Sequence, residues 1–371
     1  MSFRVRYSYL PEQFDENAID EILGELRRLV LTGDFTLGKP VAQFEGRFAE
    51  LIGVKHAIGV GSGTDALKLS LKAIGIGPGD EVITTANTFI ATVGAINEIG
   101  ARTVFVDCDD TFCMDVSQVE AAITPRTRAI LPVHLTGYMT DMRRLMPIAA
   151  KHCLPIVEDA CQGILADIEG KRAGSWGVAG AFSLHPLKNL NVWADGGVIV
   201  TDDDAIDRKL RLLRNHGLRN RDEVEILGYN SRLDSVQAIV GNWLIGQTHD
   251  ITNRRIANAA YFDQAFSEIP QIRIPPRPDD CKRVYHLYIV FAEDRDRLFD
   301  YCLENGIEVK VHYPIPIYQQ DGLKHLGYEP GDFPVADRHA REIITFPTDQ
   351  HLTREQQDIV VETVRRFYGR G

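Results

Sequence analysis

The strongest constraint on the fold of this chain is a succession of seven short apolar runs, most of them separated by segments with helical periodicity. Segments such as 64–75 and 141–152 carry apolar residues three and four positions apart. Strands that alternate with helices build βαβ units with a largely parallel sheet, and nearly continuous apolar strands indicate a sheet covered on both faces. We therefore predict an α/β fold with a central, mainly parallel seven-stranded sheet flanked by helices. Its strands are expected at residues 56–60, 80–85, 102–107, 128–133, 154–159, 180–184 and 196–201.

The rest of the sequence predicts an arm, two N-terminal helices and a smaller C-terminal domain. Residues 1–14 are expected to be extended, and helices are expected after Asp15 and after Pro40. Long helices over residues 233–268 would connect two domains. We divide these into a large domain, 1–248, and a small α+β domain, 249–371. In the small domain we expect strands at 284–291 and 307–313 and helices at 294–305 and 353–368.

Composition limits the kinds of partner. The chain has 44% hydrophobic and 25% charged residues, which fits a globular protein with a sizeable core. Its net charge of -11 argues against nucleic acid or an anionic membrane as the main partner, and no run approaches the roughly 18 apolar residues of a membrane span. The six cysteines form no CxxC pair and no zinc-like Cys/His spacing. We therefore predict a cytoplasmic protein with reduced thiols and no metal site.

Chemistry is expected at the carboxyl ends of the strands, where open α/β sheets bind their ligands. After the first run, the segment GVGSGTDAL (59–67) leads into a helix. Glycines and hydroxyl residues at such a turn leave backbone amides free, and the helix dipole favours an anion there. The segment lacks the GxGxxG spacing of a dinucleotide site. It fits either a phosphate site or an ordinary tight turn.

Two other strand ends carry an acid and an amine. Asp159 ends the run 154–159, where a buried carboxylate needs a partner. It could pair with a protonated ring nitrogen, cap a helix or join a structural ion pair. Lys188 follows the run 180–184 within FSLHPLKNLNVWADGG. Most lysines lie on the surface, but at this edge a lysine with a lowered pKa could form a Schiff base with a carbonyl.

Three more residues complete the set of candidates. Phe89 follows the run 80–85 and is either a core residue or a ring face for a planar cofactor. Asn230 and Arg232 precede a long helix and are either a cap and a surface charge or ligands. A phosphate cradle, an acid for a pyridinium nitrogen, an aromatic face and an amine are the contacts that pyridoxal 5′-phosphate needs.

Together these segments resemble the DegT-type (DegT/DnrJ/StrS) family of pyridoxal-phosphate-dependent sugar aminotransferases, which have fold type I. The matching segments keep the family's order and extend from about residue 33 to the C-terminal helix. Seven ordered segments make accidental similarity an unsatisfactory explanation. They are GVGSGTDALKLSLKAIGIGPGDEVITTANTFIAT, GARTVFVD, ITPRTRAILPVHLTGYMTDM, VEDACQG, FSLHPLKNLNVWADGG, GYNSRLDSVQA and VHYPIPIY.

The resemblance implies roles around the cofactor ring. Lys188 would be the Schiff-base lysine, and Asp159 would keep the pyridine nitrogen protonated. Phe89 would stack on the ring, and Gln162 would lie near its O3′ side. The phosphate would be held by Gly63, Thr64 and Ser183.

It also implies that two subunits share each active site. Asn230 would reach the phosphate bound in the neighbouring subunit of a homodimer. The substrate side would be lined by His312 and Tyr313, and with them His185, Arg232 and the KPVAQFE segment around Lys39.

The implied activity is a ping-pong transamination from an amino acid, with L-glutamate as the expected donor, to a keto sugar. The expected acceptor is a nucleotide-linked 3-keto deoxysugar, and a free cyclitol or sugar acid is the alternative. Dehydratases of the family carry a histidine at the lysine position, so Lys188 favours transamination. A regulator that binds the cofactor without turnover is a further alternative, although the acidic chain lacks a basic patch. Departures from the family pattern include Cys161, Ala194, the YSYLPEQF start and the FPTDQHLT segment, and the last two bear on the substrate.

Overall fold

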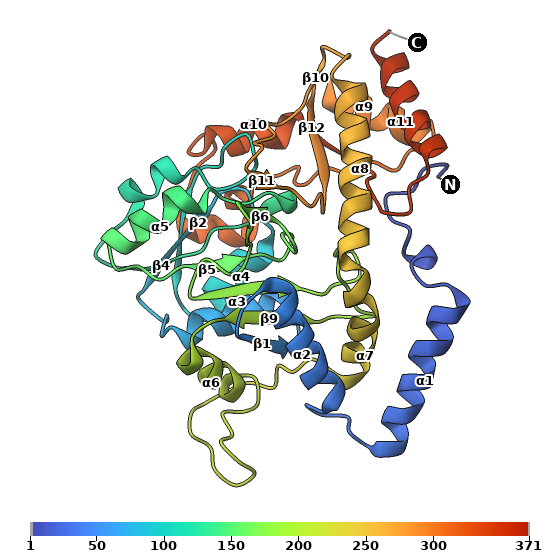
Figure 1. Cartoon of the computed structure of the whole chain (residues 1–371). Helices are drawn as coiled ribbons and strands as arrows, with labels where there is room; N and C mark the ends of the chain where they lie inside the picture. The colour runs from blue at the N-terminus through green and yellow to red at the C-terminus, as the bar shows by residue number, and fades with distance from the viewer. Residues whose placement is uncertain (1–2, 370–371) are drawn as a thin grey trace.

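The computed structural model describes residues 3–369 and has a mixed α/β fold. Figure 1 shows the strands of the N-terminal two-thirds packed among helices, with the C-terminal strands and helices above them. Helices α7 (Ser235–Leu244) and α8 (Thr248–Phe266) run along one side of the molecule and lead from the first region to the second. These two helices confirm the long helical segment that was predicted at residues 233–268.

Seven strands of the large region lie where the apolar runs predicted them. Hydrogen bonds join them into a four-stranded sheet, in the order β1-β9-β8-β5, and a three-stranded sheet, in the order β3-β2-β4. Strand β9 is antiparallel to both of its neighbours, whereas the other pairs are parallel. Regular pairing stops between β4 and β5, where only isolated parallel bridges form. The strands are β1 (His56–Val60), β2 (Glu81–Thr85), β3 (Arg102–Val106), β4 (Thr127–Ile130), β5 (Val157–Asp159), β8 (Ala179–Ser183) and β9 (Gly197–Thr201).

Helices cover these strands, and their ends follow local capping rules. Asp15 accepts a hydrogen bond from the Ala18 amide and starts α1, which ends at Gly33 in the left-handed conformation. Phe48 of α2 packs edge-to-face on Phe182 of β8, with ring centroids 5.2 Å apart. The helices of this region are α1 (Glu16–Thr32), α2 (Lys39–Ile52), α3 (Gly63–Ala73), α4 (Ile90–Glu98), α5 (Met142–Lys151) and α6 (Asp204–Leu213).

The C-terminal region has its own antiparallel sheet, in the order β10-β12-β13, and its own hydrophobic core. Strand β12 confirms the strand predicted at 284–291, displaced by a few residues. The helices predicted at 294–305 and 353–368 are present as α9 and α11. The bounds in this region are β10 (Ile272–Arg273), β12 (Tyr288–Ala292), α9 (Arg295–Glu304), α10 (Pro334–Glu342), β13 (Ile343–Phe346) and α11 (Arg354–Phe367).

The strand predicted at 307–313 was wrong. This segment makes only single bridges, from Ile307 to Val5 and from Lys310 to Thr345. The reason is that both edges of β12 are already occupied, by β10 and by β13, a strand that the sequence analysis did not predict. The extended segment therefore touches the outer edge of β13 at one residue only.

A third small sheet and the N-terminal arm tie the two regions together. The sheet pairs β6 (Asp167–Ile168) with β7 (Lys171–Arg172) and with β11 (Cys281–Lys282) of the C-terminal region. The arm runs from the C-terminal region, where it pairs with Ile307, down to α1 (Figure 1). Over residues 3–14 it is extended as predicted, except for a 3-10 turn at Leu10–Glu12, and residues 1 and 2 of the predicted arm lie outside the described residues.

Candidate active site

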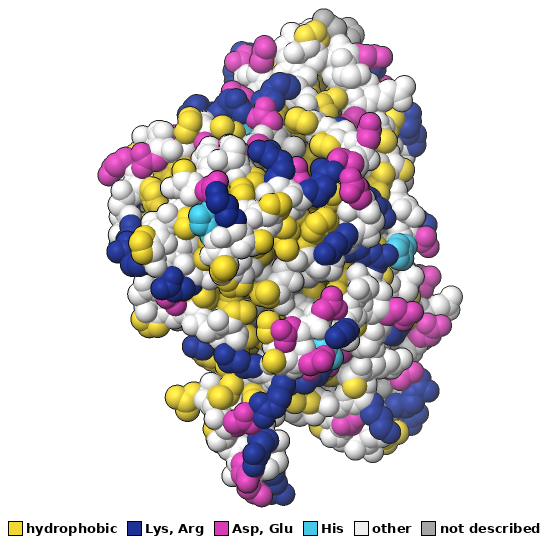
Figure 2. Space-filling view, turned by 60° about the vertical axis from the view of Figure 1, so that its left-hand side comes forward, with side chains coloured by type: hydrophobic (Ala, Val, Ile, Leu, Met, Phe, Trp, Pro, Cys, Tyr) yellow, Lys and Arg dark blue, Asp and Glu magenta, His cyan; other side chains and the backbone are white. Residues whose placement is uncertain are grey.

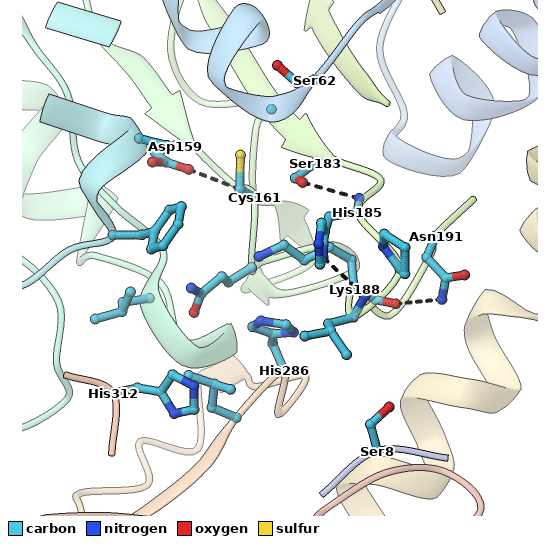
Figure 3. Close-up of a pocket in the computed structure, with 18 of the residues that line it drawn as sticks. Ser8, Ser62, Asp159, Cys161, Ser183, His185, Lys188, Asn191, His286 and His312 are labelled. Atoms are coloured by element: carbon cyan, nitrogen blue, oxygen red, sulfur yellow. Dashed lines mark hydrogen bonds between the residues drawn. The ribbon is translucent and has the colours of Figure 1, made fainter. Parts of the chain in front are cut away.

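A cavity of about 390 Å³ lies where the strand ends, the N-terminal arm and the C-terminal region meet (Figure 3). Its volume suits a small-molecule site. Ten of the twelve residues singled out in the sequence line it, drawn from segments far apart in the chain. They are Gly63, Thr64, Phe89, Asp159, Gln162, Ser183, His185, Lys188, His312 and Tyr313.

The first turn of α3 forms an anion cradle at one wall. The Ser62 hydroxyl accepts a hydrogen bond from the Asp65 amide at 3.1 Å, so the amides of Gly63 and Thr64 have no partner among the described residues. A Cβ added at Gly63 would lie 2.7 Å from the Cβ of Ser183 and 3.1 Å from the Sγ of Cys161. Glycine therefore keeps this space open, and the helix dipole favours a phosphate in it.

Asp159 is 5% exposed at the end of β5. Its Oδ2 accepts a hydrogen bond from the Thr92 hydroxyl at 2.7 Å, and its Oδ1 accepts one from the Cys161 amide at 3.2 Å. Thr92 is also paired with the Thr88 hydroxyl. A carboxylate with two such donors keeps free lone pairs. It can therefore face a protonated ring nitrogen in the cavity.

Lys188 lies in the turn between β8 and β9, and its side chain reaches into the cavity (Figure 3). Its amide donates a hydrogen bond to the His185 carbonyl at 2.8 Å, which fixes the turn. Burial lowers the pKa of its amine, and Cys161 and Asp159 oppose this only in part. Within residues 3–369 the amine has no ion-pair partner. It therefore differs from a surface lysine in the way that a nucleophilic amine requires.

Phe89 and Tyr313 provide the aromatic surface of the cavity. Phe89 is 51% exposed, so it is not a core residue, and its ring centroid lies 6.1 Å from that of Tyr313. Burial raises the pKa of the Tyr313 hydroxyl to about 12. Gln162 is held by its Oε1, which accepts a hydrogen bond from the Thr136 amide at 2.7 Å. The cavity therefore offers a planar ligand an exposed aromatic face and neutral hydrogen-bonding groups.

His312 faces the cavity from the C-terminal region. Its Nδ1 lies 3.0 Å from the Thr345 hydroxyl, and its ring is stacked on Tyr7 of the N-terminal arm. Burial and the nearby positive charge of Lys188 lower the pKa of His312 to about 4. It is therefore a neutral imidazole at physiological pH.

Several lining residues were missed in the sequence. Arg255 of α8 is 7% exposed, and its Nε donates a hydrogen bond to Gln350 at 3.0 Å. Its Nη2 lies 3.6 Å from the Asp349 carboxylate. His286 has a buried Nδ1 without a partner among the described residues, and burial lowers its pKa well below the usual value. None of these residues belongs to a motif with a chemical spacing, so the sequence offered no signal for them.

Asn230 and Arg232 lie outside this cavity. They line a separate pocket of about 250 Å³, and Arg232 donates a hydrogen bond to the Asn215 side chain at 3.0 Å. The segment that begins at Lys39 forms the start of α2 and is also absent from the cavity lining. Neither therefore contributes to the Lys188 cavity of its own chain.

Comparison with known proteins identifies the architecture around these residues. A model of the DegT/DnrJ/EryC1/StrS aminotransferase family matches residues 16–365. The chain belongs to this family. It is therefore an enzyme.

The relatives agree over nearly their whole length. A "pleiotropic regulatory protein" of Geobacillus stearothermophilus is 41% identical over 97% of both chains. A dTDP-3-amino-3,4,6-trideoxy-alpha-D-glucose transaminase of Streptomyces venezuelae is 38% identical over 99% of this chain and 98% of its own. The crystal structure of S. venezuelae DesV with a ketimine intermediate has a TM-score of 0.96, 38% identity and full coverage of both chains.

The cofactor of the enzyme is pyridoxal 5′-phosphate, which aminotransferases of this family use and which solved neighbours hold in its pyridoxal or pyridoxamine form. The residues present fit it. The glycine-walled cradle could hold a phosphate, Asp159 could accept a hydrogen bond from a protonated ring nitrogen, and Lys188 offers a desolvated amine. Within residues 3–369, none of the helices combines the length and apolar character that crossing a bilayer takes.

Proposed function

We propose that this enzyme transfers an amino group from L-glutamate to a nucleotide-linked keto sugar, and more narrowly to a 3-keto deoxysugar, in two half-reactions at one site. The observation that carries the proposal is the convergence of Lys188, Asp159 and the free amides of Gly63 and Thr64 on one cavity. Relatives named for dTDP-linked and UDP-linked amino sugars support a nucleotide-linked acceptor.

Each residue near the ring has a distinct part in this proposal. Pyridoxal phosphate, when bound, supplies a ring that withdraws electrons from the carbon that loses its proton. Lys188 holds the cofactor through its amine, and once displaced its Nζ accepts that proton and returns it at the neighbouring carbon. Burial lowers the pKa of the amine, which favours the unprotonated form that this step needs. Asp159 keeps the ring nitrogen protonated, and Phe89 covers the ring face.

In this proposal, different residues of the cavity wall bind the phosphate and the substrate. Gly63, Thr64 and Ser183 bind the phosphate, while Gln162 holds the O3′ side of the ring. On the substrate side, neutral groups orient the sugar hydroxyls without a competing charge, since burial depresses the pKa of His312 and raises that of Tyr313. His185 stands beside them at the cavity wall.

We also propose a homodimer in which Asn230 and Arg232 serve the partner's site. Their separate pocket lies outside the Lys188 cavity, as a contribution to a second subunit requires. Figure 2 shows a broad area of hydrophobic side chains rimmed by charges of both signs, which is typical of a subunit interface.

We further propose a domain boundary between residues 248 and 249. The two sheets of the large domain would act as one seven-stranded surface, which the bridges Ile130↔Ile156 and Val133↔Asp159 support.

The test starts from enzyme loaded with pyridoxamine phosphate. Keto-sugar nucleotides are screened for those that return the absorbance of the cofactor bound to Lys188, with glutamate regenerating the loaded form. The proposal predicts a response to a 3-keto deoxysugar nucleotide and none from Lys188→Ala. A response only to free cyclitols or sugar acids would replace the acceptor in the proposal.

The alternative of a regulator without turnover has only the regulatory or sensory names of some relatives in its favour, whereas the chain belongs to a family of enzymes. The buried amine and acid in one cavity favour catalysis. Binding of the cofactor at Lys188 with no half-reaction with any amino acid would favour the regulator instead. DNA binding is not expected of a chain with a net charge of -11.

A further inference from the structure

The N-terminal arm lines the active-site cavity as well as covering it. Tyr7, Ser8, Leu10 and Gln13 all contribute to the cavity wall. At its start the arm is anchored to the C-terminal region, where Val5 is bridged to Ile307. The arm thus crosses from one region of the molecule to the other at the mouth of the site.

At its far end the arm is joined to the lysine turn by a reciprocal pair of amide side chains. Asn191 donates to the Gln13 Oε1 at 3.2 Å, and Gln13 donates back to the Asn191 Oδ1 at 3.4 Å. The same Asn191 amide donates to the Lys188 carbonyl at 2.9 Å (Figure 3). Both amide residues are buried, at 8% exposure for Gln13 and 4% for Asn191.

Aromatic packing reinforces this junction. Phe14, the residue after Gln13, packs edge-to-face on Trp193, two residues beyond Asn191, with ring centroids 5.7 Å apart. The Phe14 ring also contacts Trp243 at 5.3 Å. The arm therefore reaches the lysine turn through two adjacent residues, one polar and one aromatic.

We infer that Gln13 and Asn191 are positioning residues through which the N-terminal arm orients the turn that carries Lys188. Asn191 fixes the carbonyl of the lysine itself, three residues away, and Gln13 fixes the orientation of the Asn191 amide. A buried amide has few ways to satisfy its donors and acceptors, so losing one partner frees the other to rotate. Neither residue touches the reacting atoms. The inference rests on the proposed role of Lys188.

Three variants test the Gln13–Asn191 contact and the Asn191–Lys188 contact separately. Gln13→Ala removes the arm from Asn191. Asn191→Asp keeps an acceptor for the Gln13 amide but has no donor for the Lys188 carbonyl. Asn191→Ala removes both contacts. Gln264→Ala is the control, because it truncates an exposed glutamine of α8 for which no side-chain hydrogen bond forms among the described residues.

Three readouts are measured on the holoenzyme. Borohydride reduction followed by peptide mass analysis locates the cofactor. Single-turnover absorbance with glutamate gives the rate and the donor affinity of the first half-reaction. Tryptic cleavage within the arm reports whether the arm has come loose.

We expect the cofactor on Lys188 in every variant. The half-reaction should be about 5- to 10-fold slower in the Gln13 and Asn191 variants, which is the effect of one lost hydrogen bond. The affinity for the donor should stay within about twofold of the wild-type value. Arm cleavage should accelerate in Gln13→Ala and Asn191→Ala, and stay at the wild-type rate in Asn191→Asp. Adding Gln13→Ala to Asn191→Asp should not slow the half-reaction further, because the arm acts through Asn191.

Two results overturn the inference. One is a wild-type half-reaction rate in Gln13→Ala or in Asn191→Asp. The other is additive slowing in the double variant, which would make the arm an independent wall of the site. If the wild-type cofactor is found on a residue other than Lys188, the proposed function fails instead, and the two failures are thereby told apart.

Discussion

Gly63→Ala is the sharpest test of the phosphate cradle. The backbone at Gly63 is not in the left-handed region, so alanine is compatible with the start of α3. Its Cβ, however, would stand 2.7 Å from the Cβ of Ser183. Carbon atoms settle at roughly 3.5–4.0 Å, so Ser183 has to retreat by about 1 Å. Overpacking of this kind costs about 1–3 kcal/mol, and if the cost falls on the bound state it weakens cofactor binding about 5- to 150-fold.

The assay is a titration of the apoenzyme with pyridoxal phosphate, followed by absorbance, alongside thermal unfolding of the apoenzyme. Gly46→Ala in the middle of α2 is the matched control, since its Cβ would meet nothing within 4 Å. It should bind the cofactor normally and gain about 0.5–1 kcal/mol of stability. Gly63→Ala with wild-type cofactor affinity and an unchanged apoenzyme would show that the space beside Ser183 is not the phosphate cradle.

Three further predictions concern the amine of Lys188, the carboxylate of Asp159, and the ion pair between the buried Glu81 and the exposed Arg126. Lys188→Met should abolish covalent cofactor attachment yet stabilise the apoenzyme by about 1 kcal/mol in urea unfolding, because it removes an amine whose pKa burial has lowered. Asp159→Asn should retain the cofactor but slow single turnover with glutamate by about 10²–10⁴-fold, the range for removing one acid–base partner. Burial raises the pKa of Glu81, but hydrogen bonds, including those from Arg126, outweigh it and leave the pKa below the usual value. Arg126→Ala should therefore cost about 1 kcal/mol of stability at pH 7, and that difference should vanish as the pH falls through the lowered folded-state pKa, whereas a pH-independent difference in chemical unfolding would contradict the pairing.

Strand positions in the large region followed from sequence because the physical signal there is local. Each of the seven apolar runs forms a mostly buried strand, and β2 and β9 are buried at every residue. The C-terminal region gives a weaker signal. Its short strand β13 has only four residues, and the alternating run at 307–313 resembles a strand but makes only single bridges, to Val5 and to Thr345 of β13. How far a run pairs along a strand edge is a property of the assembled sheet and not of the run itself.

The candidate site likewise contains residues with a local sequence signal and residues without one. Lys188, Asp159 and Gly63 each stand at or just after the end of an apolar run, and the geometry of α/β sheets brings such ends together whatever the rest of the chain does. Arg255, His286 and Gln13 reach the cavity from a connecting helix, a loop and the arm. Their convergence depends on how the C-terminal region and the arm pack on the large region, for which no spacing rule exists.

The strand-end residues and the other lining residues would contact different parts of the bound molecules. On the proposed function, the strand-end residues would hold the parts that every reaction of the cofactor has in common, namely its phosphate, its ring nitrogen and its amine link. The other lining residues, among them Tyr7 and Leu10 of the arm, His286, His312 and Arg255, would then be left to meet the sugar. Most of these groups are neutral at physiological pH, and Arg255 is offset by Asp349 at 3.6 Å. A neutral wall binds hydroxyls and methyl groups without a charge penalty, whereas a sugar acid would have to compete with Asp349 for Arg255. On the proposed function, we therefore expect the sugar presented to Lys188 to be a neutral keto sugar, with Arg255 left to meet the carboxylate of the amino donor.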